Sequence, residues 1–473
     1  MKMFVGGAWR DGSRQIEVSN PFDDSVIDTV PHGNADDVKT ALATLEAGAA
    51  EMRAMPAFER SQMLTRVSRL MLEHAEALAQ TISREEGKIL AESRMEAGRA
   101  AEIIQLSAEE AKRLGGEVLP LDGSEGNTGQ LGLTLRVPCG IVAAISPFNF
   151  PLHLVCHKVG PALAGGNAVL IKPATDTPLC ALQLVELLLQ AGVPPTAVAC
   201  ITGPGGELGD AICTDRRIRK ISFTGSYEVG DRICRMAGVK KVTMELGSNA
   251  PLIVMDDADM DKVVNATAMT GYSNAGQVCI SAQRVMAVEP VYDMFVDRLA
   301  QRVATMTTGD QLEENVNVGP MVRARDAERV CQWIEEAVSG GARLLAGGER
   351  DGANVAPAVL ADVNPDSRIN CEELFGPAVG VTRVADIEEG IARANETNYG
   401  LSAAIFTQDI DRALRFARKV DAGNIHINWG PQWRADLMPY GGMKDSGMGK
   451  EGPRYAVEEM TELKTVVVHT PRA

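Results

Sequence analysis

The segment that decides the fold reads Gly140-Ile141-Val142-Ala143-Ala144-Ile145-Ser146-Pro147. It is a short apolar run with β-branched residues that ends at a serine and a proline, which is the pattern of a buried strand. Three further apolar runs follow, at 168–171, 198–201 and 220–223, and each ends at a polar residue followed by proline or glycine. Helical stretches such as 179–191 separate the runs. This alternation predicts a doubly wound parallel sheet of the α/β class.

The carboxyl ends of these strands form the predicted ligand site. Ligands of doubly wound sheets bind beyond the carboxyl ends of the strands, so we expect one rim to carry Ser146, Lys172, Gly203 and Gly225. The usual dinucleotide pattern G-x-G-x-x-G is absent, but glycine-rich turns at 203–209 and 225–230 each follow a strand and open a helix. Such turns can bring backbone N–H groups to a pyrophosphate, although glycines there also serve structure alone.

The segments on either side of this sheet continue the α/β pattern. From about Asp36 to Leu114, good helix formers recur at helical spacing, with Gly87 as the predicted break, and we interpret most charges there as solvated helix faces. After the sheet, a strand over 250–254 precedes an acidic helix start at 256–261. Helix capping explains that acidic cluster. We therefore expect no metal site.

Composition excludes several classes of protein. The 473 residues are enough for two or three domains, and the net charge of −16 argues against nucleic acid as a partner. No segment reaches the roughly 18 apolar residues that a membrane span requires, so we expect no membrane partner. The nine cysteines include no close-spaced pair typical of metal or redox sites. This pattern predicts reduced thiols in the cytoplasm, without a zinc site or a disulfide framework.

One cysteine is a candidate nucleophile because of its setting. It lies in the run Ser273-Asn274-Ala275-Gly276-Gln277-Val278-Cys279-Ile280-Ser281, just beyond a predicted helix. A thiolate is favoured by a helix terminus, by backbone N–H groups or by a nearby cation, and a Gly-Gln turn can supply such a setting. Taken alone, Cys279 can also be a small buried apolar residue.

Six motifs, in this order, resemble the signature motifs of the aldehyde dehydrogenase superfamily. The similarity covers essentially the whole chain, from Gly6-Gly7 to the final strand near 466–468. The motifs are Pro147-Phe148-Asn149-Phe150-Pro151, Phe223-Thr224-Gly225-Ser226, Met244-Glu245-Leu246-Gly247, Gly276-Gln277-Val278-Cys279, Glu373-Leu374-Phe375-Gly376-Pro377 and Asn398-Tyr399-Gly400-Leu401-Ser402.

The resemblance implies catalytic roles for three residues. Cys279 is expected to attack the aldehyde carbonyl, and the Asn149 amide, with the backbone N–H of Cys279, to stabilise the oxyanion. Hydride transfer to a nicotinamide then leaves a thioester. Glu245 is expected to act as the general base for its hydrolysis. Without the resemblance, Glu245 can also be a buried structural carboxylate and Asn149 a turn residue.

The resemblance also implies NADP or NAD as the cofactor. It places Lys172 at the adenine ribose, Gly225 and Ser226 near the pyrophosphate, Glu373 at the nicotinamide ribose and Phe375 against the nicotinamide ring. The other residues expected at this site are Ser146, Pro147, Phe148, Thr175, Gly205, Gly209, Phe223, Thr224 and Leu246.

Thr175 bears on the choice between the two cofactors. Many NAD-preferring members carry glutamate three residues after the lysine, where its carboxylate repels a 2′-phosphate. The neutral Thr175 removes this repulsion, so we expect NADP to be accepted alongside NAD. Asp176 follows directly and leaves the preference open.

The substrate is expected to be a small polar aldehyde. The chain resembles most the branch with lactaldehyde, non-phosphorylating glyceraldehyde-3-phosphate and phosphonoacetaldehyde dehydrogenases, and this implies Gln105, His157, Ile280 and Arg434 as substrate-binding residues. Arg434 and His157 are candidates to bind an anionic sulfonate, phosphonate or carboxylate tail. Alternatively, the substrate is only hydroxylated, Arg434 pairs with Asp436 on the surface, and His157 is structural.

Two other functions remain as alternatives. One is a coenzyme-A-acylating aldehyde dehydrogenase, but such relatives lack the base that Glu245 supplies. The other is a non-catalytic binding homologue, which would have no reason to keep Cys279, Glu245 and Asn149 together.

The resemblance further implies the domain organisation. We expect a Rossmann-like cofactor-binding domain over 1–122 and 139–247 and an α/β catalytic domain over 248–433. We also expect a small β extension over 123–138 and 459–473 that pairs with another subunit in a homodimer or homotetramer. An unpaired strand edge would otherwise be exposed, which gives a physical reason for association.

Overall fold

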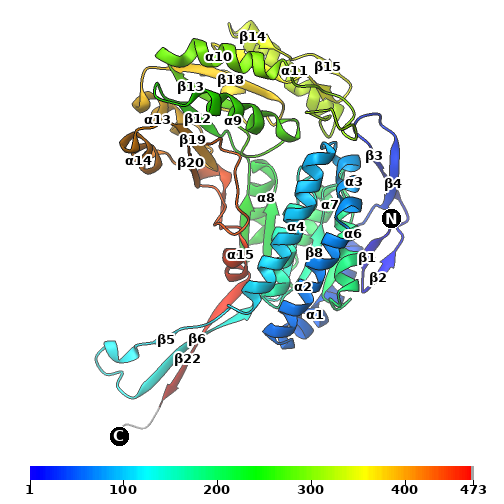
Figure 1. The fold of residues 1–473 in the computed structure, drawn as a ribbon. Helices are drawn as coiled ribbons and strands as arrows, with labels where there is room; N and C mark the ends of the chain where they lie inside the picture. Colours follow the sequence, from blue (N-terminus) through cyan, green and yellow to red (C-terminus); the bar gives the residue numbers. More distant parts are fainter. Residues whose placement is uncertain (470–473) are drawn as a thin grey trace.

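The computed structural model describes residues 1–469. Two α/β lobes lie one above the other and a β-arm projects from the lower lobe (Figure 1). Each lobe is built on its own mainly parallel sheet. The predicted α/β class with a doubly wound sheet is therefore confirmed.

The first lobe is centred on an 8-stranded sheet in the order β2-β1-β9-β8-β7-β10-β11-β21. Strands β7 to β11 pair in parallel, and the outer strands β1, β2 and β21 pair antiparallel. The strands are β1 (Met3–Val5), β2 (Ala8–Arg10), β7 (Ile141–Ile145), β8 (Ala168–Lys172), β9 (Val198–Cys200), β10 (Ile218–Thr224), β11 (Lys241–Glu245) and β21 (Gly447–Met448).

The order of the strands creates the switch point at which such sheets bind ligands. From β7 the chain continues to β8 and β9 on one side, and then crosses to β10 and β11 on the other. Right-handed crossovers place α5 (His153–Ala164) and α6 (Leu179–Gln190) on one face, and α7 (Gly205–Thr214) and α8 (Tyr227–Ala237) on the other. The carboxyl ends of β7 and β10 therefore flank the crevice.

The predicted helical region consists of four helices. They are α1 (Ala35–Ala54), α2 (Ala57–Glu73), α3 (Ala75–Glu86) and α4 (Leu90–Ala111). The predicted break at Gly87 is confirmed, since this residue ends α3 with φ of 93°. Two further breaks were not predicted. The first has a local cause, because Pro56 forces the preceding Met55 into an extended conformation that ends α1.

The second lobe is centred on a 7-stranded sheet in the order β14-β17-β18-β13-β12-β19-β20. Only the edge strand β14 pairs antiparallel. The strands are β12 (Pro251–Val254), β13 (Arg284–Val288), β14 (Arg343–Ala346), β17 (Ala358–Ala361), β18 (Ala378–Val384), β19 (Ser402–Phe406) and β20 (Asn424–Ile427). The helices are α9 (Met260–Tyr272), α10 (Glu289–Val303), α11 (Ala324–Ser339), α12 (Arg368–Cys371), α13 (Ile387–Asn395) and α14 (Ile410–Lys419).

The arm is a three-stranded antiparallel sheet in the order β22-β6-β5. Its strands are β5 (Val118–Leu119), β6 (Gln130–Pro138) and β22 (Thr461–His469), and α15 (Pro453–Glu459) leads into it. Short hairpins are formed by β3 (Gln15–Ser19) with β4 (Val26–Pro31) and by β15 (Arg350–Asp351) with β16 (Asn354–Val355). Part of the predicted segment 459–473, namely 470–473, lies outside the described residues, and the domain boundaries remain a prediction.

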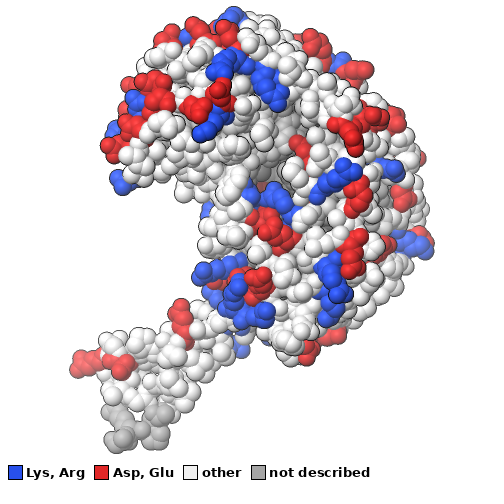
Figure 2. Space-filling model, in the orientation of Figure 1, with Lys and Arg blue, Asp and Glu red and all other residues white. Residues whose placement is uncertain are grey.

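The surface carries charges of both signs. On the face shown in Figure 2, lysines and arginines alternate with acidic residues on the two lobes, whereas most of the arm surface is uncharged. The same view shows a hollow between the lobes. Within residues 1–469, no helix has the length and apolar character needed to cross a membrane.

Candidate active site

Two cavities meet at Cys279. The larger, of about 950 Å³, lies at the carboxyl ends of the first sheet, and the smaller, of about 200 Å³, lies between α4, α5 and the segment 432–440. Cys279 is among the residues that line both cavities, together with Thr224, Leu246 and Leu154. A molecule in either cavity can therefore reach the same thiol.

The loop before Cys279 has an unusual backbone that the surrounding protein holds in place. After α9 ends at Tyr272, Asn274, Ala275 and Gly276 all have positive φ, at 51°, 52° and 68°. Non-glycine residues rarely adopt this conformation, and it persists only where surrounding contacts enforce it. A Cβ at Gly276 would lie 2.0 Å from the carbonyl oxygen of Gly376. Glycine is therefore required there.

Side chains from distant segments fix this loop. The backbone N–H of Asn274 donates to Glu92 at 3.0 Å, and its side-chain amide donates to Glu86 at 3.0 Å. Gln277 donates to the Asn274 carbonyl at 3.2 Å and accepts from the N–H of Val322 at 3.0 Å. These bonds hold the nucleophile loop between the two lobes.

Asn149 is tied to the same loop. Its Nδ2 donates to the carbonyl of Gln277 at 2.7 Å, which leaves the second N–H of this amide for another acceptor. Its own carbonyl accepts from Lys88 at 2.7 Å and from the Asn274 amide at 3.1 Å. The amide is thus oriented before any substrate arrives.

Glu245 is buried and its two carboxyl oxygens have no hydrogen-bond partner among the described residues. Burial, and next the negative charge of Glu451, raise the pKa of Glu245 well above its usual value. Burial would also raise the pKa of Glu451, but Lys158 and Arg434 lower it below the usual range. Within this pair Glu245 therefore holds a proton more readily than Glu451, and Glu451 is the more readily ionised of the two.

Glycine at position 441 leaves room for Glu245, because a Cβ there would lie 2.7 Å from Oε1 of this carboxyl.

The smaller cavity includes two of the four predicted substrate-binding residues. Arg434 and Ile280 line it, whereas Gln105 and His157 do not. The Arg434 side chain is only 7% exposed and pairs with Glu451 at 3.2 Å, not with Asp436 on the surface. His157 lies behind it, with Nδ1 3.1 Å from the Arg434 guanidinium. Burial, and next Arg434, lower the pKa of His157 to about 3, so this ring is neutral.

Arg99 is a cavity residue that the sequence analysis missed. It reaches from α4 into the smaller cavity, donates to both oxygens of Asp436 at 2.6 and 3.0 Å, and also donates to the Arg434 carbonyl at 3.2 Å. Its side chain is 38% exposed, which makes it the most accessible of the three cations that line this cavity. The third cation, Lys88, is fully buried against Glu96.

His153, His157 and Asp436 lie close enough to hold a metal ion. However, Asp436 already accepts from Arg99 and hydrogen bonds with His153 Nε2 at 3.0 Å. The guanidinium groups of Arg99 and Arg434 flank the cluster and would repel a cation. We therefore do not propose a metal site there.

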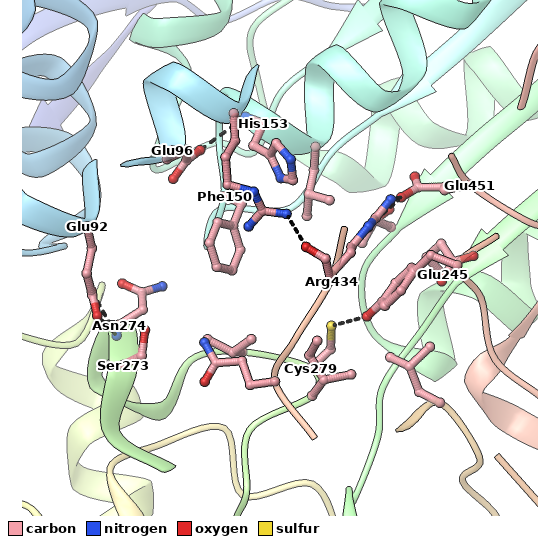
Figure 3. Close-up of a pocket in the computed structure, with 18 of the residues that line it drawn as sticks. Glu92, Glu96, Phe150, His153, Glu245, Ser273, Asn274, Cys279, Arg434 and Glu451 are labelled. Atoms are coloured by element: carbon pink, nitrogen blue, oxygen red, sulfur yellow. Dashed lines mark hydrogen bonds and ion pairs between the residues drawn. The ribbon is translucent and has the colours of Figure 1, made fainter. Parts of the chain in front are cut away.

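Most charged residues between 36 and 114 are at least partly exposed, as predicted. The exceptions are Glu85, Glu86, Lys88 and Glu96, which are buried. Glu96 accepts the backbone N–H groups of Leu152 and of its neighbour at the start of α5. Figure 3 shows Glu92 and Glu96 directed toward the cavity region. Helical periodicity could not reveal this, because the partners lie far along the chain.

All of the predicted cofactor residues line the larger cavity: Ser146, Pro147, Phe148, Lys172, Thr175, Gly205, Gly209, Phe223, Thr224, Gly225, Ser226, Leu246, Glu373 and Phe375. The first of the two glycine-rich turns leads into α7. The space beside its glycines is open, since no atom lies within 4 Å of a Cβ added at Gly205, Gly206 or Gly209. A pyrophosphate could approach this backbone closely. The cavity therefore fits a dinucleotide.

The residues predicted at the ribose and at the nicotinamide have defined surroundings in this cavity. Lys172 is buried, and burial lowers its pKa to about 8. Glu373 accepts the backbone N–H of Ser248 at 2.9 Å, and burial raises its pKa to about 7. Phe375 meets Phe148 edge-on, with ring centroids 5.8 Å apart.

Asp176 is held by a residue of the other lobe. Arg323, which the sequence analysis did not single out, forms an ion pair with Asp176, and both line the larger cavity. The neighbouring Thr175 donates its hydroxyl to the carbonyl of Gly203 at 3.1 Å. The charge of the Asp176 carboxylate, next to the predicted ribose-binding residues, is thus balanced by Arg323.

Comparisons with known proteins agree with this geometry. The family model described as "Aldehyde dehydrogenase family" matches residues 9–466. A 3-sulfolactaldehyde dehydrogenase of Priestia aryabhattai is 41% identical over 467 residues, which cover 99% of this chain and 98% of the relative. Aspartate-semialdehyde dehydrogenase 1 of Pseudomonas canavaninivorans is 42% identical over 96% of each chain. A solved glyceraldehyde-3-phosphate dehydrogenase from Methanocaldococcus jannaschii, complexed with NADP, has a TM-score of 0.93 at 37% identity and covers 97% of this chain and 100% of that one.

Proposed function

Because the chain belongs to the aldehyde dehydrogenase family, we propose that it oxidises a small polar aldehyde to the carboxylic acid through a thiohemiacetal and a thioester on Cys279. The observation that carries this proposal is that Cys279 lines both cavities. An aldehyde carbon held at the sulfur from the smaller cavity also faces the larger one, where the cofactor fits.

The first step is attack of the Cys279 thiolate on the aldehyde. The negative charge that develops on the carbonyl oxygen needs preorganised donors. The free N–H of the Asn149 amide and the backbone N–H of Cys279 are proposed to supply them, since Gln277 already orients that amide. When bound, the nicotinamide cofactor accepts the hydride from the carbon attached to sulfur.

The second step is hydrolysis of the thioester with Glu245 as the general base. Its raised pKa suits this task, because a carboxylate of higher pKa accepts a proton from water more readily. Only the ionised form of Glu245 can accept this proton, so the rate of this step is expected to rise with pH. The presence of this base favours hydrolysis over transfer of the acyl group to coenzyme A.

The proposed cofactor is NADP or NAD. Thr175 is neutral and Asp176 is paired with Arg323, so neither residue presents a free carboxylate that would repel a 2′-phosphate. The NADP complex of the Methanocaldococcus jannaschii relative supports this proposal. We expect NADP to bind alongside NAD.

The proposed substrate is a small polar aldehyde, and the relatives that act on sulfolactaldehyde and aspartate semialdehyde support this class. For an anionic tail, Arg434 keeps its Nε free of any hydrogen-bond partner among the described residues, but its side chain is only 7% exposed and pairs with Glu451. Arg99 is more exposed and keeps donor capacity beyond its bonds to Asp436. We therefore add Arg99 to the proposed tail-binding residues.

The arm is proposed to pair with another subunit in a homodimer or homotetramer. It exposes Leu131, Leu135, Leu463, Val467 and Val468, which is more apolar surface than a free arm would be expected to carry. The described cysteines are all free thiols, which supports the proposed cytoplasmic location.

The proposed activity is tested by following cofactor reduction with small neutral, hydroxylated, carboxylated, sulfonated and phosphonated aldehydes, with NAD and NADP in parallel. We expect turnover of at least one polar aldehyde, a free acid as product and no activity in Cys279→Ser. A thioester product that requires coenzyme A would instead support the acylating alternative. Absence of turnover with every aldehyde would support the non-catalytic one.

A further inference from the structure

Tyr440 lies beside the sulfur of Cys279 and has no part in the chemistry described above. Its Oη is 3.4 Å from Sγ, the contact drawn as a dashed line from Cys279 in Figure 3. Its backbone exchanges two hydrogen bonds with Glu451, at 3.1 and 2.7 Å. Its side chain is buried in a small apolar cluster with Val278, Ile280 and Leu401. The position of the hydroxyl is therefore fixed from both the backbone and the ring.

The chemistry of this contact favours the hydroxyl as the donor. Burial, and next the neighbouring Cys279, raise the pKa of Tyr440 well above its usual value, so the hydroxyl keeps its proton at physiological pH. The guanidinium carbon of Arg434 lies 4.0 Å from the centre of the Tyr440 ring. A cation over the ring withdraws electron density and strengthens the O–H as a donor. Within residues 1–469 this hydroxyl has no hydrogen-bond partner other than Cys279.

The nucleophile needs such a donor. Burial raises the pKa of the Cys279 thiol to about 12, while the hydrogen bond from Tyr440 acts in the opposite direction. The carboxyl groups of Glu373 and Glu245 disfavour the thiolate further. Only the thiolate attacks a carbonyl. A hydrogen-bond donor held at the sulfur therefore increases the fraction of Cys279 that is ionised and directs the sulfur lone pair.

We propose that Tyr440 is a catalytic hydrogen-bond donor that stabilises and orients the thiolate of Cys279. This inference rests on the proposed function, in which Cys279 is the nucleophile. If the Tyr440 side chain only packed in the cavity wall, phenylalanine would serve equally well, because it fills nearly the same space. The experiment must therefore measure the effect of the Tyr440 hydroxyl by itself.

The test is the pH dependence of Cys279 alkylation by iodoacetamide in the full-length protein. Since the chain has nine cysteines, the modified Cys279 peptide is quantified by mass spectrometry. In Tyr440→Phe we expect alkylation at neutral pH, well below the midpoint, to be about tenfold slower, which corresponds to a midpoint about one pH unit higher. The value of kcat/KM should fall about tenfold, while cofactor affinity stays unchanged. The matched control is Tyr272→Phe, whose hydroxyl donates to the Ala358 carbonyl at 2.8 Å, and its midpoint should not move.

A second variant covers the case in which Tyr440→Phe does not fold. Replacing Tyr440 by 3-fluorotyrosine keeps the hydroxyl and makes it a stronger donor, so the midpoint should fall. A wild-type midpoint in the folded variants would overturn the inference. The underlying function is checked separately with Cys279→Ser. If that variant still oxidises aldehydes, the proposed function is wrong; if it is inactive while Tyr440→Phe keeps the wild-type midpoint, only the role of Tyr440 is wrong.

Discussion

Replacing Glu245 with glutamine should separate the two halves of the proposed reaction. Neither carboxyl oxygen of Glu245 has a hydrogen-bond partner among the described residues, so the nearly isosteric amide removes no such contact. The change also removes an acidic group beside Glu451, and we expect no loss of folding stability. The effect on rate can then be assigned to the missing base. General base catalysis contributes roughly 10²- to 10⁴-fold, or about 3 to 5 kcal/mol of barrier.

The assay is stopped-flow measurement of the reduced cofactor in the presence of aldehyde. Glu245→Gln should give a burst of about one equivalent per active site, because attack and oxidation do not need the base, followed by a steady state about 10²- to 10⁴-fold slower than wild type. The wild-type hydrolysis rate should rise with pH, since ionised Glu245 is the active form and its pKa is raised. The control is Glu73→Gln on the exposed surface of α2. A steady-state rate near wild type, or a slow phase with no burst, would refute this assignment.

Three further changes test other parts of the site. Arg99→Leu should raise KM about 10- to 100-fold for anionic aldehydes, because a charge-assisted hydrogen bond to the tail is lost. The KM for neutral aldehydes should change little. Equal changes for both kinds of aldehyde would exclude tail binding by Arg99. Arg323→Ala should free Asp176 and weaken NADP binding relative to NAD in fluorescence titrations, and an unchanged ratio would contradict the role of this ion pair. Gly276→Ala should lower the melting temperature, because the added Cβ would clash with the carbonyl oxygen of Gly376 and because φ is positive there. Gly98→Ala, at a helical position with open space around it, should not lower it. Equal melting temperatures for the two variants would contradict this.

Local patterns in the sequence located the sheet and its rim. The apolar runs before Ser146 and Lys172 each coincide with a parallel strand, because burial on both faces leaves a continuous apolar signal. The nucleophile loop was found through its motif, but its three left-handed residues were not predicted. Their conformation depends on Glu86 and Glu92, which lie more than one hundred residues earlier in the chain.

The residues around the smaller cavity were the least predictable. Arg99 and Asp436 form an ion pair although they are 337 positions apart in the chain. Neither residue has a local sequence pattern that indicates its partner. Tyr440 and Cys279 are 161 positions apart. A charge in a helical segment has the same local pattern whether it faces solvent or a distant acid. Pairing across the fold therefore decides which charges are buried, and the sequence shows no such pairing directly.

In the proposed reaction the substrate is bound covalently to Cys279 as a thioester. The most direct test is mass spectrometry of Glu245→Gln after incubation with aldehyde and oxidised cofactor, because slow hydrolysis should let the intermediate accumulate. We predict that the acyl mass is found on the peptide that contains Cys279 and that hydroxylamine removes it. An unmodified Cys279 peptide under conditions in which the cofactor is reduced would show that the oxidation does not proceed through a thioester on Cys279.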